Sequence, residues 1–171
     1  FHFGDYWYDF PISIFRYFNE EDEIKIRNSK KIYFEEWLNK LDNLAKTLEK
    51  KSVKIIVSLP TPEFPKAKYK QCQYQNPQWF NTTIENCSYS YDFFASKDGK
   101  YFNIISKLKE ISINNENLYL FDSLNLMCPN GKCSYADKGK MLYMNDPDHL
   151  SNYSSRYIYA PEMIKFIDEI K

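Results

Sequence analysis

The residues best suited to chemistry lie close together near the C-terminal end, between positions 142 and 151. This stretch contains His149, one of only two histidines in the chain, with Asp146 three residues before it and an apolar, helix-like tail after it. A carboxylate at this spacing can bond one imidazole nitrogen and leave the other facing a cleft, which is the base half of a nucleophilic triad. The pattern therefore predicts a general base at His149 that is oriented by Asp146.

Two other interpretations of the same residues stay open at the level of sequence. In the first, Asp146 or Asp148 caps the N-terminus of a helix and His149 only occupies its first turn. In the second, Asp148 takes the place of Asp146 beside the imidazole. We interpret Ser151 as a helix-turn hydroxyl rather than a nucleophile, and His2, in an aromatic run, as structural.

The elements that must position these residues follow from the spacing of apolar side chains. Repeats of three and four residues predict helices at 32–50 and 101–111. Short apolar runs at 53–58 and 118–121 are typical of buried parallel strands. The first run ends in Leu-Pro-Thr-Pro, at the carboxyl edge where ligands bind in open α/β sheets.

The remaining segments complete one domain over residues 1–171. Residues 141–144 predict a short extended piece that delivers Asp146 and His149, and residues 150–170 predict a closing helical region divided by Pro161. The charged residues 19–31 predict a solvated excursion. Alternating helices and strands indicate an α/β fold, a three-layer α/β/α sandwich with a parallel sheet and flavodoxin-like arrangement.

Four cysteines indicate an oxidising compartment. Their spacing pairs Cys72 with Cys87 and Cys128 with Cys133, and the first pair would staple a long insertion at about 63–100. Zinc is the alternative, but structural zinc sites favour Cys-x-x-Cys pairs or nearby histidines. The cysteines therefore favour disulfides over a metal, and with them a periplasmic, surface or secretory location.

Composition narrows the classes of partner. Positive and negative side chains number 23 each, so the net charge is zero, which gives no electrostatic basis for binding nucleic acid or an anionic membrane surface. No apolar run approaches the roughly 18 residues that a transmembrane helix needs. Trp7, Trp79 and the tyrosines of the insertion suit stacking on sugar rings, but also plain packing.

Taken in order, these pieces resemble the SGNH (GDSL-like) hydrolases, and in particular the SGNH domain fused to bacterial membrane acyltransferase-3 proteins, which O-acetylate surface polysaccharides. The resemblance rests on the strand and proline loop at 53–62, the cysteine-bearing insertion, the Cys128–Cys133 hairpin and the closing block at 142–151. In that family the closing block supplies the Asp and His of the triad, here Asp146 and His149.

The resemblance implies an extracytoplasmic acyltransferase that moves acetyl groups onto a polysaccharide hydroxyl, without metal or cofactor. A fused membrane domain would deliver the acetyl group, and the chain would lie on the periplasmic or extracellular face of the bacterial inner membrane. The implied alternative on the same scaffold is a carbohydrate O-acetylesterase. A third hypothesis, from another class, is a non-catalytic glycan-binding domain.

The chain departs from the family pattern at the nucleophile. Where the family has Gly-Asp-Ser, this sequence offers only Gly4-Asp5-Tyr6, and no glycine and asparagine blocks can be assigned to the oxyanion hole. We therefore expect an N-terminally truncated domain whose nucleophilic serine precedes Phe1; a degenerate, inactive domain is the alternative.

Overall fold

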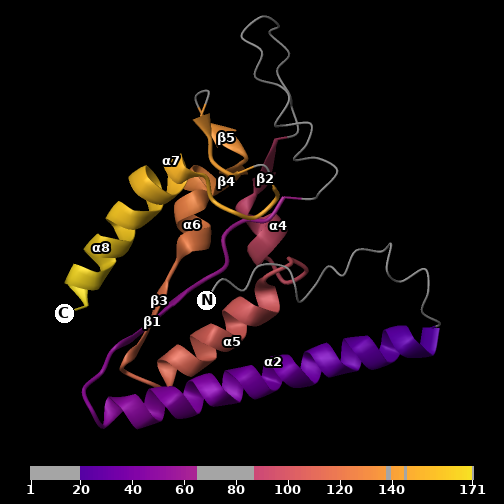
Figure 1. Cartoon of the computed structure of the whole chain (residues 1–171), viewed down its shortest axis with the longest axis vertical. Coiled ribbons are helices and arrows are strands. Elements are labelled where there is room, and N and C mark those ends of the chain that lie inside the picture. Colours follow the sequence, from indigo (N-terminus) through magenta and orange to yellow (C-terminus); the bar gives the residue numbers. More distant parts are fainter. Residues whose placement is uncertain (1–19, 65–86, 138–139, 145, 171) are drawn as a thin grey trace, which may run out of the picture. The chain divides into compact units, whose positions relative to one another are not determined.

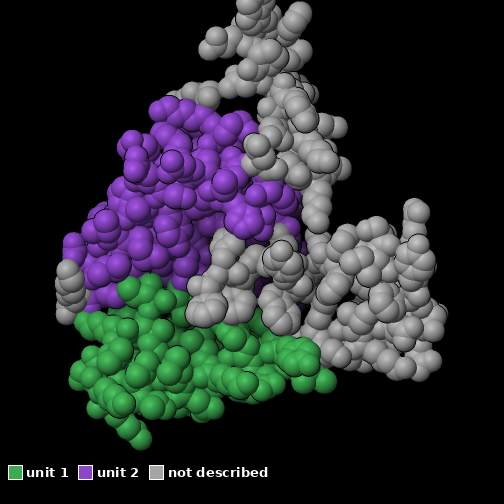
Figure 2. Space-filling model, in the orientation of Figure 1, with its two compact units in different colours: residues 1–57, 106–120 green, residues 58–105, 121–171 purple. Residues whose placement is uncertain are grey.

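The computed structural model describes residues 20–64, 87–137, 140–144 and 146–170, with only the backbone for residues 20–31. The described residues fall into two compact units (Figure 2), one made of those within residues 20–57 and 106–120, the other of those within residues 58–105 and 121–170. The elements in chain order (Figure 1) are the helix α2 (Glu20–Glu49), the strands β1 (Ile55–Ser58) and β2 (Ser88–Ser90), the helices α4 (Tyr91–Ala95) and α5 (Phe102–Ile113), the strand β3 (Leu118–Phe121), the helix α6 (Ser123–Met127), the 3₁₀ turn η1 (Pro129–Gly131), the strands β4 (Lys132–Ser134), β5 (Ala136–Asp137) and β6 (Lys140–Met141), the short helix α7 (Asn152–Ser154), the π-helix η2 (Ser155–Tyr159) and the helix α8 (Ala160–Glu169).

The strands β1 and β3 are hydrogen-bonded neighbours, as their apolar composition predicts. The Ile55 N–H donates to the Asn117 carbonyl at 2.7 Å, and the Leu59 N–H donates to the Phe121 carbonyl at 2.9 Å. From the first bond to the second, the donor and the acceptor both move toward the C-terminus, so the two strands run parallel. This parallel pair, with its helices, confirms the α/β class.

In the first unit, the buried Asn117 forms hydrogen bonds to the end of α2 and to the segment just before β1. The Asn117 side-chain amide donates to the carbonyls of Ala45, at 2.9 Å, and Val53, at 3.0 Å. Asn115 binds α2 as well, with its amide 2.8 Å from the Asp42 carboxylate. The two Asn117 bonds satisfy backbone carbonyls around the turn between helix and strand, where the regular ladders end.

The structure differs from the prediction at the start of one helix and within the insertion. The prediction starts α2 at residue 32 and leaves residues 19–31 as an excursion, whereas the helix begins at Glu20. Glu and Lys have high intrinsic helix propensity, so a charged segment can extend a helix without an apolar stripe. The insertion at 63–100 is also less irregular than predicted, because it contains β2 and α4; its residues 65–86 lie outside the described part.

The core of the second unit is a cluster of aromatic rings around Phe64. The Phe64 ring lies 4.9 Å from the Tyr143 ring, 5.4 Å from Tyr135, 5.8 Å from Tyr89 and 6.4 Å from Phe94, centroid to centroid, in tilted or edge-to-face orientations. Such geometries match the positive edge of one ring to the negative face of the next. The antiparallel pair β2–β4 brings Tyr89 opposite Cys133 and so joins the insertion to the cysteine hairpin.

Candidate active site

Residues 142–144 and 146–151 form a hairpin-like arrangement rather than a strand that leads directly into a helix. Tyr143 and Leu150 form an antiparallel bridge. On either side of it, the Met144 N–H donates to the His149 carbonyl at 2.8 Å and the Ser151 N–H donates to the Leu142 carbonyl at 2.9 Å. The chain therefore turns back on itself and presents Asp146, Asp148 and His149 near the tip.

At this tip, Asp146 holds His149 through both carboxylate oxygens. Oδ2 lies 3.0 Å from the imidazole Nδ1. Oδ1 accepts the backbone N–H of His149 at 2.8 Å and that of Asp148 at 3.2 Å. An ionised carboxylate can only accept, so Nδ1 carries the proton of the neutral ring and Nε2 is left with a lone pair. With 57% of the His149 side chain exposed, the arrangement suits a general base open to a reactant.

The second acid, Asp148, also reaches the imidazole. Its Oδ1 lies 3.3 Å from Nδ1, and its side chain is 19% exposed. Asp146 is the better-oriented partner, because its distance is shorter and its other oxygen is fixed by two backbone N–H groups. The sequence alternative that gives Asp148 this place is therefore the less favoured one.

Neither aspartate caps the following helix. The helix begins at Asn152, and its N-cap is Ser151, whose hydroxyl oxygen accepts the Ser154 N–H at 3.1 Å and whose proton goes to the Met141 carbonyl at 2.7 Å. The capping interpretation of Asp146 and Asp148 is thus wrong, and Ser151 is the helix-turn hydroxyl that its sequence context predicts. The hydroxyl secures the loop's C-terminal end.

The hydrogen bonds to the Asp146 carboxylate change its acidity. Burial raises the pKa of this carboxyl, but the N–H bonds from His149 and Asp148 and the positive charge of a protonated imidazole outweigh it, so the pKa lies below its ordinary value of 3.8. Asp146 is therefore ionised throughout the physiological range, which its role beside His149 requires.

This lowered pKa predicts how acid affects Asp146→Asn. Between its folded and ordinary pKa values, Asp146 binds fewer protons in the folded than in the unfolded chain, so falling pH favours unfolding. We expect the wild type to exceed Asp146→Asn in free energy of unfolding at pH 5, and this difference to shrink as the pH falls from 3.8 through the lower pKa of the folded state. Urea unfolding of both proteins at pH 3 to 6 measures this difference in the free energy of unfolding. A difference that is constant, or that grows in acid, would contradict the bonding described.

The same three side chains could also bind a cation. One ligand atom from each of Asp146, Asp148 and His149 lies within 4.8 Å of the others, a spacing suited to shared coordination of a divalent ion. Such an ion would compete for the carboxylate oxygens that orient the imidazole. Binding a cation and acting as an Asp–His pair are therefore alternative uses of this cluster.

The loop joins the edge of the sheet where the sequence predicts ligand binding. Phe64 follows the proline-bearing segment after β1, and its N–H donates to the Pro147 carbonyl at 2.9 Å. A backbone bond thus fixes the residue between the two aspartates. This contact connects two segments of the chain that the sequence singled out separately.

The cysteines agree with the disulfide prediction as far as the structure describes them. Cys128 and Cys133 form a disulfide that closes η1 into a short stapled turn, with Asn130 at φ 55° and Gly131 at φ 73°, positions that favour such residues. Cys87 is also in a disulfide. Cys72 lies outside the described residues, so its pairing with Cys87 stays a prediction.

The family of the chain follows from a match to a known family's sequence model. The sequence model of the SGNH domain (fused to AT3 domains) matches residues 4–161. The chain belongs to this SGNH family. No curated protein and no solved structure gives a significant match.

Membership of the SGNH family confirms the predicted fold relationship and gives the class of activity. The chain is a hydrolase-like domain of the esterase and acyltransferase type, and its family consists of SGNH domains fused to AT3 domains. Among the described residues, no helix has the length and apolarity to cross a membrane. Gly4-Asp5-Tyr6, the segment that stands where the family has Gly-Asp-Ser, lies outside the described residues.

Proposed function

We propose that this SGNH domain is the extracytoplasmic part of an O-acyltransferase that moves an acetyl group onto a hydroxyl of a cell-surface polysaccharide. The observation that best supports the proposal is the exposed His149 imidazole bonded to Asp146, in a family whose SGNH domains are fused to AT3 domains. In the proposed arrangement, the fused membrane domain supplies the acetyl group from the cytoplasmic side. The SGNH domain lies on the periplasmic or extracellular face of the inner membrane.

The proposed reaction has two acyl-transfer steps, each with the same base. A serine upstream of Phe1 attacks the carbonyl carbon of the acetyl donor while His149 Nε2 takes the hydroxyl proton. The donor's leaving group departs with that proton, and the acetyl group stays on the serine as an ester. A sugar hydroxyl then gives its proton to Nε2 and attacks this ester, and the serine oxygen recovers the proton as it leaves.

Asp146 has a defined part in this cycle. When Nε2 is protonated, the imidazole carries a positive charge, and the ionised carboxylate 3.0 Å from Nδ1 stabilises it. The same contact keeps the proton on Nδ1 between steps, so the accepting lone pair of the neutral ring is on Nε2. No step needs a metal ion or an organic cofactor.

The second candidate function is hydrolysis of a carbohydrate O-acetyl ester on the same scaffold. More than half of the His149 side chain is exposed, so the ring is accessible to water as well as to a sugar hydroxyl. The two functions differ only in the acceptor: water yields acetate, and a saccharide yields a new ester.

The assay that tests the proposal follows a labelled acetyl group through the full-length protein. We expect membranes containing the protein to transfer the label to added surface polysaccharide, with little free acetate. A fluorophosphonate probe should label a serine upstream of Phe1 and spare Ser123 and Ser154, which are fully buried. Label released as acetate whether or not saccharide is present would favour the esterase. Saccharide binding with neither acetyl chemistry nor probe labelling would favour a glycan-binding domain.

A further inference from the structure

We propose that the Tyr135 hydroxyl is a positioning group for the Asp146–His149 pair. The proposal rests on the function proposed above and adds a residue to its machinery. The Tyr135 hydroxyl lies against two carbonyl oxygens of the loop, those of Met144 and of Asp146, the latter at 3.1 Å. A phenol has one proton, so the bond is shared between the two acceptors. It thereby fixes the backbone of the residue whose carboxylate orients the imidazole.

Tyr135 is itself held rigidly, as a positioning group must be. Its side chain is fully buried, stacked on the Tyr143 ring at 5.5 Å and set edge-on to the Phe64 ring at 5.4 Å. Its backbone N–H donates to the Cys87 carbonyl at 2.9 Å, and its carbonyl accepts the Leu142 N–H at 3.0 Å. A ring packed in this way has few rotamers available, so the hydroxyl stays where the loop needs it.

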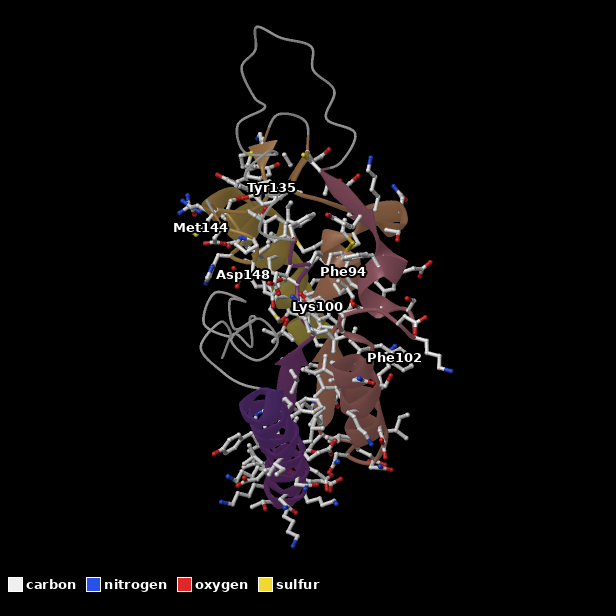
Figure 3. All side chains as sticks on the ribbon, turned by 90° about the vertical axis from the view of Figure 1, so that its right-hand side faces the viewer. Phe94, Lys100, Phe102, Tyr135, Met144 and Asp148 are labelled. Atoms are coloured by element: carbon white, nitrogen blue, oxygen red, sulfur yellow. A yellow bond between two sulfur atoms is a disulfide. The ribbon has the colours of Figure 1, made fainter. Side chains whose placement is uncertain are left out.

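Tyr135 also connects the disulfide-bonded cysteines to the Asp146–His149 pair. The residue lies two positions after Cys133, which is in the disulfide with Cys128, and its N–H bonds the carbonyl of Cys87, which is also in a disulfide. Both cross-linked segments therefore converge on the residue that holds the Asp146 backbone. Figure 3 labels Tyr135, Met144 and Asp148 in the same part of this unit.

Tyr143 offers a matched comparison within the same aromatic cluster. Its ring is buried and stacks on Tyr135, but its hydroxyl has no hydrogen-bond partner among the described residues. Tyr135→Phe and Tyr143→Phe each remove one buried oxygen and keep the ring. Only the first removes a bond to the loop.

The experiment compares the two variants in the full-length protein, below the temperature at which circular dichroism shows either to unfold. We expect Tyr135→Phe to lower kcat for acetyl transfer by about tenfold or more with little change in KM, because small displacements of catalytic groups reduce turnover strongly. Tyr143→Phe should retain the wild-type kcat. By ¹³C NMR, Asp146 should titrate closer to its ordinary pKa in Tyr135→Phe than in the wild type.

The outcomes separate this inference from the proposed function. Equal kcat values in the two variants, or an Asp146 titration unchanged by Tyr135→Phe, would overturn the positioning role even if His149→Ala is inactive. An active His149→Ala would overturn the proposed function. The Asp146 titration would still show whether the Tyr135 hydroxyl controls the geometry of the loop.

Discussion

Replacing His149 with alanine in the full-length protein is expected to reduce acetyl transfer by between about 10⁴- and 10⁶-fold, as removal of the base or its orienting acid does in serine hydrolases. Without Nε2, the proposed reaction loses the base that takes the proton of the nucleophile. The serine would then attack as a neutral hydroxyl, which is a weak nucleophile. The measurement is single-turnover acetyl transfer with a labelled donor.

The same experiment has an internal control in the neighbouring acids. Asp146→Asn should lose nearly as much activity as His149→Ala, because an amide can donate to Nδ1 and so favour the wrong tautomer. Asp148→Asn should lose much less, since Asp148 lies farther from Nδ1, at 3.3 Å rather than 3.0 Å. Because the His149 side chain is mostly exposed, the melting temperature should change little. Wild-type turnover in His149→Ala would refute the triad assignment.

The parts of the fold that sequence could predict are those encoded by neighbouring residues. The apolar run Leu118–Phe121 forms β3 with the predicted bounds, because a short β-branched or aromatic run leaves few alternatives to a buried strand. Pro161 lies in the first turn of α8, directly after the π-helix η2. The Asp146–His149 contact could be predicted for the same reason, since two residues three positions apart are held close together by the local chain.

The parts that could not be predicted depend on contacts between distant residues. The sequence gives no signal that a tyrosine eleven positions before Asp146 would reach its carbonyl, or that the N–H of Phe64 would bind Pro147. Tyr135 is one of 15 tyrosines, and only the packing of the aromatic cluster distinguishes it. The helix-capping alternative failed for a local reason instead: Ser151 directly precedes the first helical residue, and its hydroxyl accepts the Ser154 N–H.

Replacing Phe64 with alanine is expected to have the largest effect on stability, about 3–5 kcal/mol in the free energy of unfolding. The Phe64 side chain is 2% exposed and contacts four other rings. Its removal would leave a cavity that rigid aromatic neighbours cannot fill, so the transfer term and the cavity term both oppose folding. Urea unfolding followed by near-ultraviolet circular dichroism, which reports on the buried tyrosines, measures the loss.

Phe93 provides the matched control, because its ring packs against Tyr89 and Phe94 of the cluster but the residue is 45% exposed. Phe93→Ala should cost about 1 kcal/mol or less, as most surface substitutions do, and Phe64→Leu should fall between the two because it restores most of the volume. Equal losses for Phe64→Ala and Phe93→Ala would show that the cluster is not the core of this unit. Because Phe64 packs against Tyr135 and its N–H binds Pro147, Phe64→Ala should also lower kcat at temperatures where it remains folded. The core and the candidate active site therefore depend on the same ring.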